Sequence, residues 1–153
     1  MDYKIQREIA SIDALFNLCT KIDDEEIQAH FAKYLCVKVS GLFENCIIMM
    51  IRNYVSKSSS KLTTKFVNTQ MKNFTNVKFE RLQSLLASFD EQWKVLLDEK
   101  FKDNKLKETL NSIVSNRHNI AHYSNNDSVS FHRLEKQYVD VKKIIEIVDN
   151  IVK

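Results

Sequence analysis

The near absence of turn-forming residues limits the fold most: the 153-residue chain has no proline and a single glycine, Gly41. Tight β-turns and hairpins depend on glycine for positive φ and on proline for a fixed φ, so strands joined by short loops are disfavoured. The sequence therefore predicts an all-α fold. The length and the 44% hydrophobic content suit a single domain over residues 1–153.

Helical periodicity and polar breaks divide the chain into expected helices. A first helix ends near Cys19, and the acidic run at residues 23–26 supplies an N-cap for a long second helix that reaches Tyr54 or Val55. Gly41 weakens that helix by roughly 1 kcal/mol relative to alanine, so close helix packing is expected there. Shorter helices follow in the middle of the chain, at residues 62–72, 76–88 and 90–100.

Two further helices are expected late in the chain. One starts near Asp103 and ends at the polar run of residues 124–128. The last carries an apolar stripe with spacings of three and four, formed by Phe131, Leu134, Tyr138, Val141, Ile145, Val148 and Val152. This pattern indicates core packing in an antiparallel bundle with long second and last helices, and Ile144, Ile147 and Ile151 widen the stripe enough to contact a second subunit as well.

Six residues near one expected helix end combine a permanent cation with two titratable imidazoles: Arg117-His118-Asn119-Ile120-Ala121-His122. Arginine matches phosphate oxygens with a planar fork of donors, and histidine exchanges protons near neutral pH. Together they are suited to RNA cleavage without a metal or another cofactor. On an ideal helix Arg117 and His122 lie ~140° apart, whereas His118 and His122 lie ~40° apart. Arg117 and His122 can therefore converge only if the helix ends near His122 or if the long arginine side chain reaches round the helix.

Two other interpretations of the motif stay open. The i, i+4 spacing of His118 and His122 matches a two-histidine metal site, with His132 or Glu44 as a third ligand. No glutamate follows His118 as a zincin helix requires, so no metal site is predicted. In a purely structural alternative, Arg117 pairs with a carboxylate and the histidines cap a helix end.

Glu44 and Asn45 interrupt the most apolar part of the long helix. An unpaired carboxylate is costly to bury, so Glu44 either faces water or has a partner such as Arg117. We expect Glu44, Asn45 and Asn119 to support the motif.

The middle of the chain is basic, although the net charge is only +3. Lys61, Lys65 and Lys72 belong to this segment and interleave with Phe66 and Phe74, whose rings can stack on bases. The segment is expected to be either a solvated basic face or a track for an RNA backbone.

The three cysteines, Cys19, Cys36 and Cys46, form no Cys-x-x-Cys pair and lie in apolar stretches, which indicates a reducing, cytoplasmic setting. The charged start of the chain does not match a signal peptide. The stretch from Leu42 to Ile51 is shorter than the ~20 residues of a membrane span, so no membrane partner is predicted.

The Arg-x4-His spacing of Arg117 and His122, late in an all-helical chain and ahead of one last helix, resembles the HEPN (higher eukaryote and prokaryote nucleotide-binding) superfamily. The local sequence Arg-His-x-Ile-Ala-His and the stretch Tyr34–Glu44 of the long helix look most like its RiboL-PSP branch. The resemblance covers roughly Asp13 to Val152. His118 stands where the superfamily often has Asn or Asp, and Ser124 stands where toxins paired with a nucleotidyltransferase antitoxin have tyrosine.

The resemblance implies a function. HEPN proteins typically form homodimers in which two Arg-x4-His motifs face each other, and many are metal-independent endoribonucleases that act as toxins or defence effectors. By this resemblance Arg117 binds the scissile phosphate, and His122 acts as general base or acid for attack by the ribose 2′-OH, with His118 as a further catalytic candidate. RNA, a second copy of the chain and an antitoxin or defence-system protein are the expected partners. The alternative is a non-catalytic module that binds RNA, nucleotide or a partner protein.

Overall fold

The computed structural model describes residues 1–122 and 129–153. These residues contain no strand and form seven α-helices and one 3-10 turn: α1 (Tyr3–Thr20), α2 (Glu25–Ser58), α3 (Lys61–Gln70), η1 (Met71–Asn73), α4 (Phe79–Phe89), α5 (Glu91–Lys100), α6 (Lys105–Ala121) and α7 (Phe131–Ile151). The predicted all-α fold is confirmed. The break expected at residues 124–128, including Ser124, lies outside the described residues.

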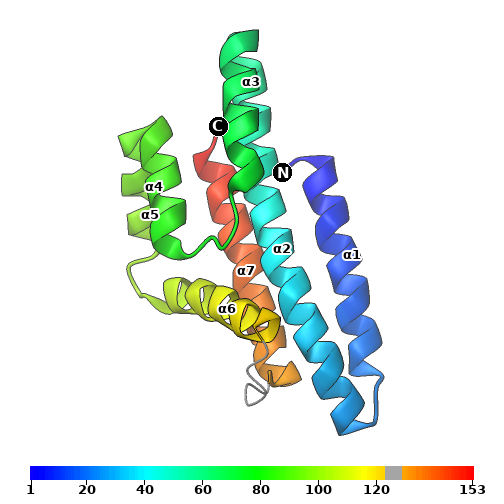
Figure 1. Ribbon diagram of the computed structural model, residues 1–153. Coiled ribbons are helices and arrows are strands. Elements are labelled where there is room, and N and C mark those ends of the chain that lie inside the picture. Colours follow the sequence, from blue (N-terminus) through cyan, green and yellow to red (C-terminus); the bar gives the residue numbers. More distant parts are fainter. Residues whose placement is uncertain (123–128) are drawn as a thin grey trace.

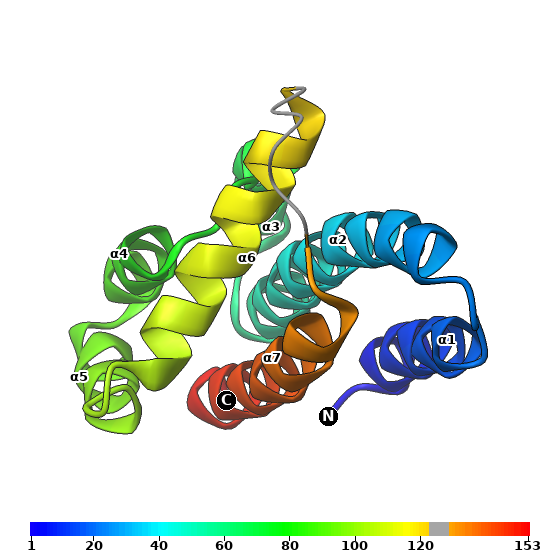
Figure 2. The ribbon, with the colours of Figure 1, turned by 90° about the horizontal axis from the view of Figure 1, so that it is seen from below.

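The long helix α2 is the centre of the arrangement, since α1, α3, α6 and α7 all pack against it. Helix α1 runs antiparallel to α2 along one side, and α7 lies on another side and runs in the same direction as α2 (Figure 1). Helices α4 and α5 form a hairpin at the edge, and α6 crosses α2 and α7 (Figure 2). The helices between α2 and α7 therefore form a long crossover, which connects the end of α2 to the start of the parallel helix α7.

Side-chain caps explain where several helices begin. Asp24 accepts the N–H of Ile27 at 2.9 Å, which confirms that the acidic run starts the long helix. Asp90 accepts the N–H of Gln92 at 2.8 Å in the same way. A carboxylate at this position satisfies a backbone donor that has no partner within the helix and complements the helix dipole.

The start of α4 was predicted at Asn76, but the helix begins at Phe79. Asn76 cannot be a helical residue, because its φ is 55° and its N–H is used in a long-range contact. The N–H of Phe79 is instead accepted by Oδ1 of Asn111, on α6, at 2.9 Å. An asparagine from another helix thus caps α4, and spacing along the sequence gives no sign of such a cap.

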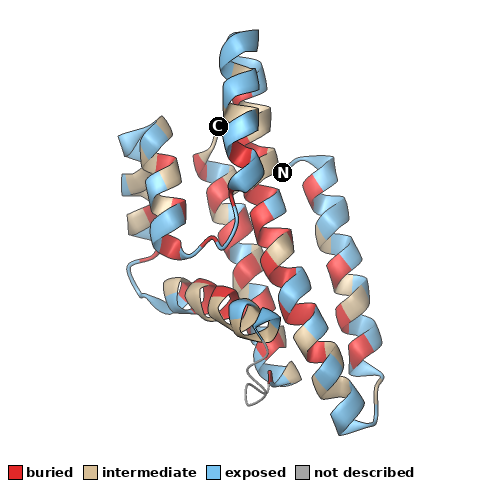
Figure 3. Cartoon of the chain, viewed as in Figure 1, coloured by how far each residue is buried: buried red, intermediate tan, exposed pale blue. Residues whose placement is uncertain are grey.

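The apolar stripe of α7 is covered by the chain's own helices, as the core interpretation predicts. Buried residues, red in Figure 3, gather where α2, α6 and α7 face one another. Ile144 and Ile151, which were expected to widen the stripe toward a second subunit, are buried, and Ile147 is partly buried against the core. The stripe therefore does not provide a free dimer surface.

The expected close packing at Gly41 is wrong. A Cβ atom built on Gly41 meets no atom of a neighbouring helix within 4 Å.

Helix α2 is long enough and apolar enough to cross a membrane. However, 61% of its most apolar 18-residue stretch is buried against the rest of the protein. Its apolar character is accounted for by its central place in the core.

The three cysteines are unpaired and buried, in agreement with their apolar surroundings. Burial raises the pKa of the Cys36 thiol to about 11 and that of Cys46 to about 12, since a thiolate is poorly solvated inside the core. Cys36 also contacts the carbonyl oxygen of Ile113 through its sulfur at 3.9 Å. These thiols are packing groups of the core.

Candidate active site at the end of α6

The Arg-x4-His motif spans the C-terminal end of α6. The last helical residue is Ala121, and His122 follows as the C-cap with φ −103° and ψ 21°. Its N–H donates to the carbonyl oxygens of His118, at 3.1 Å, and Asn119, at 3.2 Å. The helix therefore ends near His122, as predicted. The direction of the His122 side chain is not set by helical geometry.

Arg117 is fixed from one side by acceptors that come from two distant parts of the chain. Its Nη1 atom donates to Oδ1 of Asn76 at 2.8 Å and lies 3.5 Å from Oε1 of Glu44. The side chain of Glu44 is 8% exposed, whereas that of Arg117 is 30% exposed. The ion pair that the sequence suggested between Glu44 and Arg117 is thus present, and the Glu44 carboxylate is buried rather than facing water.

Asn76 completes this cluster, and no motif in the sequence marks it as a site residue. Its backbone N–H donates to the same Oε1 atom of Glu44 at 2.7 Å, while its side chain accepts from Arg117. The left-handed backbone, φ 55°, allows both contacts at once. Asparagine tolerates this conformation better than most residues, which is the only sequence signal available, since its two partners lie 32 and 41 residues away.

The two histidines lie next to each other at the exposed end of α6. Their ring centroids are 4.3 Å apart and the rings are inclined by 51°. His118 also lines a pocket of about 310 Å³ with five other residues, namely Asn76, Lys78, Val114, Ser115 and Asn119. One pocket therefore brings together the asparagine that holds Arg117, a lysine, and one histidine of the motif.

Other predicted site residues lie elsewhere. Asn45 is exposed one position beyond Glu44, ~100° further round α2, and so points away from the side that holds Arg117. His132 lies on α7 with its Nδ1 atom 3.8 Å from Glu135. In the part of the chain that the structure describes, no three His, Cys, Asp or Glu side chains are placed to hold a metal ion. Neither His132 nor Glu44 therefore joins the two histidines as a third ligand.

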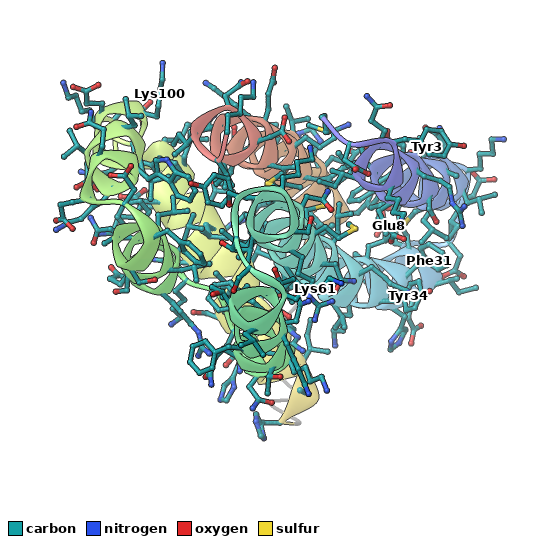
Figure 4. The ribbon with its side chains drawn as sticks, turned by 90° about the horizontal axis from the view of Figure 1, so that it is seen from above. Tyr3, Glu8, Phe31, Tyr34, Lys61 and Lys100 are labelled. Carbon is teal, nitrogen blue, oxygen red and sulfur yellow. The ribbon has the colours of Figure 1, made fainter. Side chains whose placement is uncertain are left out.

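Lys61, Lys65 and Lys72 line one groove of about 520 Å³ beside α3, together with hydroxyl and amide side chains that include Ser56, Thr64 and Asn68. Helix α3 has no buried residue. It lies on the same face of α2 as the C-terminal end of α6 (Figures 1 and 2). Lys61, labelled in Figure 4, is exposed and is the first residue of α3. The structure thus brings the three lysines to a common surface, whose role stays a prediction.

The helical arrangement and the Arg-x4-His motif at the end of α6 are those of a HEPN-type domain. A family model described as RiboL-PSP-HEPN matches residues 3–153, and the chain belongs to that family. The predicted resemblance, including the branch, is confirmed. No curated protein and no solved structure matches the chain.

Proposed function

We propose that this chain is a metal-independent endoribonuclease, one HEPN-type domain over residues 1–153 that acts as a homodimer on RNA in a toxin or defence role. The observation that carries the proposal is the guanidinium of Arg117, held by Asn76 and Glu44, near a helix end that also carries two exposed, adjacent imidazoles. This combination supplies a fixed cation for a phosphate and groups that exchange protons near neutral pH.

Arg117 is suited to binding the scissile phosphate. Its hydrogen bond to Asn76 and its ion pair with Glu44 both use Nη1, and no hydrogen bond or ion pair to another described residue involves Nε or Nη2. The edge formed by Nε and Nη2 is the one that pairs with two phosphate oxygens in a bidentate manner. The positive charge would stabilise the extra negative charge that develops on the phosphate oxygens in the transition state.

The histidines supply the proton transfers. The ribose 2′-oxygen attacks phosphorus and loses its proton to one group, the bond from phosphorus to the 5′-oxygen breaks, and the leaving 5′-oxygen gains a proton from a second group. The products are a 2′,3′-cyclic phosphate and a 5′-OH. His122 fills one of these roles, and His118, whose ring centroid is 4.3 Å away, can relay or supply the second proton.

The homodimer and the RNA path belong to the same proposal. Members of this superfamily commonly dimerise, and pairing near the end of α6 would double the positive charge where the phosphate binds. The groove lined by Lys61, Lys65 and Lys72 lies on the same face as this end, so an RNA strand can follow it toward the motif. A cytoplasmic location and an antitoxin or defence-system partner complete the proposal.

The second candidate is a non-catalytic module that binds RNA, nucleotide or protein through the same surface. The ion pair of Arg117 with buried Glu44 favours it, because such a pair also serves a purely structural role. The two candidates differ in one respect: a binding module has no requirement for a proton-transfer group at position 122.

The test is incubation of the pure protein with mixed RNA in EDTA. We expect cleavage with a 2′,3′-cyclic phosphate end, and we expect Arg117→Ala and His122→Ala each to lower the rate by at least ~10²-fold, the scale of losing an acid–base group. His118→Ala should cost less. His132→Ala is the matched control, since this exposed histidine of α7 is outside the Arg-x4-His motif, and its rate should be unchanged. Cleavage that survives both motif substitutions contradicts the mechanism, and RNA binding without cleavage favours the second candidate.

A further inference from the structure

We propose that Asn76 is a positioning residue for Arg117: its side chain fixes the guanidinium so that the Nε and Nη2 edge faces the scissile phosphate, and its backbone N–H fixes the Glu44 carboxylate beneath. This inference rests on the proposed function and deepens it. Asn76 comes from the loop between η1 and α4, a part of the chain that the Arg-x4-His motif does not include.

Two contacts made by one residue carry the inference. The N–H of Asn76 donates to Glu44 at 2.7 Å, and its Oδ1 accepts from Arg117 at 2.8 Å. Glu44 and Arg117 are themselves 3.5 Å apart, which is long for a direct charge-assisted hydrogen bond. Asn76 therefore makes the shorter contact with each partner, and the alignment of the guanidinium depends on it more than on the ion pair.

The backbone at Asn76 indicates that this geometry is stabilised by its surroundings. A left-handed conformation is unfavourable for most non-glycine residues, although asparagine is among the residues that tolerate it best. The φ of Asn76 is 55°, and the bond to the buried Glu44 carboxylate compensates for that cost. Strained backbone of this kind persists only where neighbouring contacts hold it.

The loop that carries Asn76 is firmly attached to the fold on both sides. Val77 is fully buried, and Phe74 is buried with the guanidinium of Arg81 over its ring at 5.4 Å. Immediately after the loop, the N–H of Phe79 is held by Asn111 of α6 at 2.9 Å. Since α6 also carries Arg117, the position of the loop and the position of the arginine are both fixed relative to α6.

A fixed arginine matters for the rate because a free one must be ordered during each turnover. Immobilising a long side chain costs conformational entropy. Preorganised donors stabilise developing charge without reorganisation at the moment of reaction, and small displacements of such groups can be costly. Loss of the Asn76 side chain should therefore lower the rate of the chemical step rather than the proton affinity of the histidines.

The experiment compares Asn76→Gly with Asn76→Asp. Glycine keeps the left-handed backbone and the N–H that contacts Glu44, so only the acceptor for Arg117 is removed. Aspartate also tolerates this conformation and restores an acceptor oxygen. Asn104→Gly is the matched control, because Asn104 has a nearly identical φ of 57° at the start of α6 and makes no side-chain capping bond there.

We expect Asn76→Gly to lower kcat by roughly 10- to 100-fold, in line with the effect of misplacing a catalytic group. The pH profile should keep its shape, Asn76→Asp should recover part of the rate, and Asn104→Gly should match the unsubstituted protein. Equal rates for Asn76→Gly and Asn104→Gly would overturn the inference. A loss that Asn76→Asp does not recover at all, with the pH profile displaced, would do so as well.

A second readout keeps this inference separate from the proposed function. In ¹⁵N NMR spectra the Nη protons of Arg117 should exchange slowly in the unsubstituted protein and in Asn104→Gly, and fast in Asn76→Gly. If the unsubstituted protein fails to cleave RNA but this difference is seen, the nuclease proposal falls and the positioning of Arg117 by Asn76 stands. If slow exchange persists in Asn76→Gly, Asn76 does not hold the guanidinium.

Discussion

The Oε1 atom of Glu44 lies 3.5 Å from Nη1 of Arg117, and the carboxylate is almost entirely buried within α2 while the arginine is partly open to solvent. This asymmetry gives the two charges different roles. Burial of Glu44 without its partners would be costly, so the carboxylate depends on Arg117 and on the N–H of Asn76. Arg117 can still reach a ligand from its exposed side.

Removing the carboxylate should destabilise the fold. Glu44→Ala leaves the N–H of Asn76 without its acceptor and should lower the free energy of unfolding by ~1–3 kcal/mol, measured by urea titration. Glu44→Gln keeps an acceptor oxygen and should cost less. Glu80→Ala is the control, since Glu80 forms an exposed pair with Lys107 at 3.2 Å, and its loss should cost under ~1 kcal/mol. Equal costs for Glu44→Ala and Glu80→Ala would contradict the buried cluster.

Gly41 offers a stabilising substitution. Because a Cβ atom at Gly41 meets nothing within 4 Å and the residue lies inside α2, alanine should fit without strain. Gly41→Ala should raise the free energy of unfolding by roughly 0.5–1 kcal/mol, through higher helix propensity and a less flexible unfolded chain. Thermal and urea denaturation measure the change. A loss of stability would show that glycine is required here for a reason that its surroundings do not reveal.

Alkaline pH should destabilise the protein through its buried thiols. Burial raises the pKa of Cys36 to about 11 and that of Cys46 to about 12 from a reference of 9.0, and burial also raises the pKa of Tyr138. A raised native pKa contributes stability that is complete below about pH 9 and is lost as pH rises toward the native value. Between pH 9 and its native pKa, each thiol should lower the free energy of unfolding by ~1.4 kcal/mol per pH unit.

Urea titrations from pH 8 to 11 test this dependence. Cys46→Ala should be less stable at pH 8, because it leaves a small cavity, but should lose less stability per pH unit above pH 9. An unchanged slope in Cys46→Ala would show that this thiol does not titrate on unfolding. Iodoacetamide should label Cys36 and Cys46 slowly in the native protein and rapidly in urea, since the thiolate is the reactive form.

Substitutions in the lysine groove distinguish between two roles for it, an RNA track and a solvated surface. Replacing Lys61, Lys65 and Lys72 with glutamine should weaken RNA binding and reduce the salt slope by ~0.7 per lost phosphate contact, with turnover at saturating RNA nearly unchanged. A triple substitution at three exposed lysines on other elements, Lys100, Lys102 and Lys143, controls for net charge. If both triple variants lose affinity equally, net charge rather than the groove attracts RNA.

Local sequence signals were sufficient for most of the fold. The lack of proline and the single glycine predicted the helical class, and the acidic run at residues 23–26 correctly predicted the start of the long helix. The end of α6 near His122 could also be inferred, because a polar run follows at residues 124–128 of the sequence. These features depend on residues that lie within a few positions of one another.

Contacts between distant segments could not be predicted in the same way. Local spacing predicts a helix that starts at Asn76, whereas the φ of 55° at this residue is stabilised by Glu44, 32 residues earlier. The packing expected at Gly41 failed because neighbouring helices do not approach that face of α2. Such errors arise from tertiary contacts that override local preference, and the same contacts build the site around Arg117.

The hydrogen bonds at His122 give the two halves of the motif unequal resistance to heat. Arg117 is tied to α2 and to the loop before α4, whereas the backbone of His122 is held by the carbonyls of the preceding turn, those of His118 and Asn119. Terminal turns open at a far lower free energy than the core of a domain. On warming, the end of α6 should fray first, so the proton-transfer group would lose its alignment while the phosphate-binding arginine is still in place.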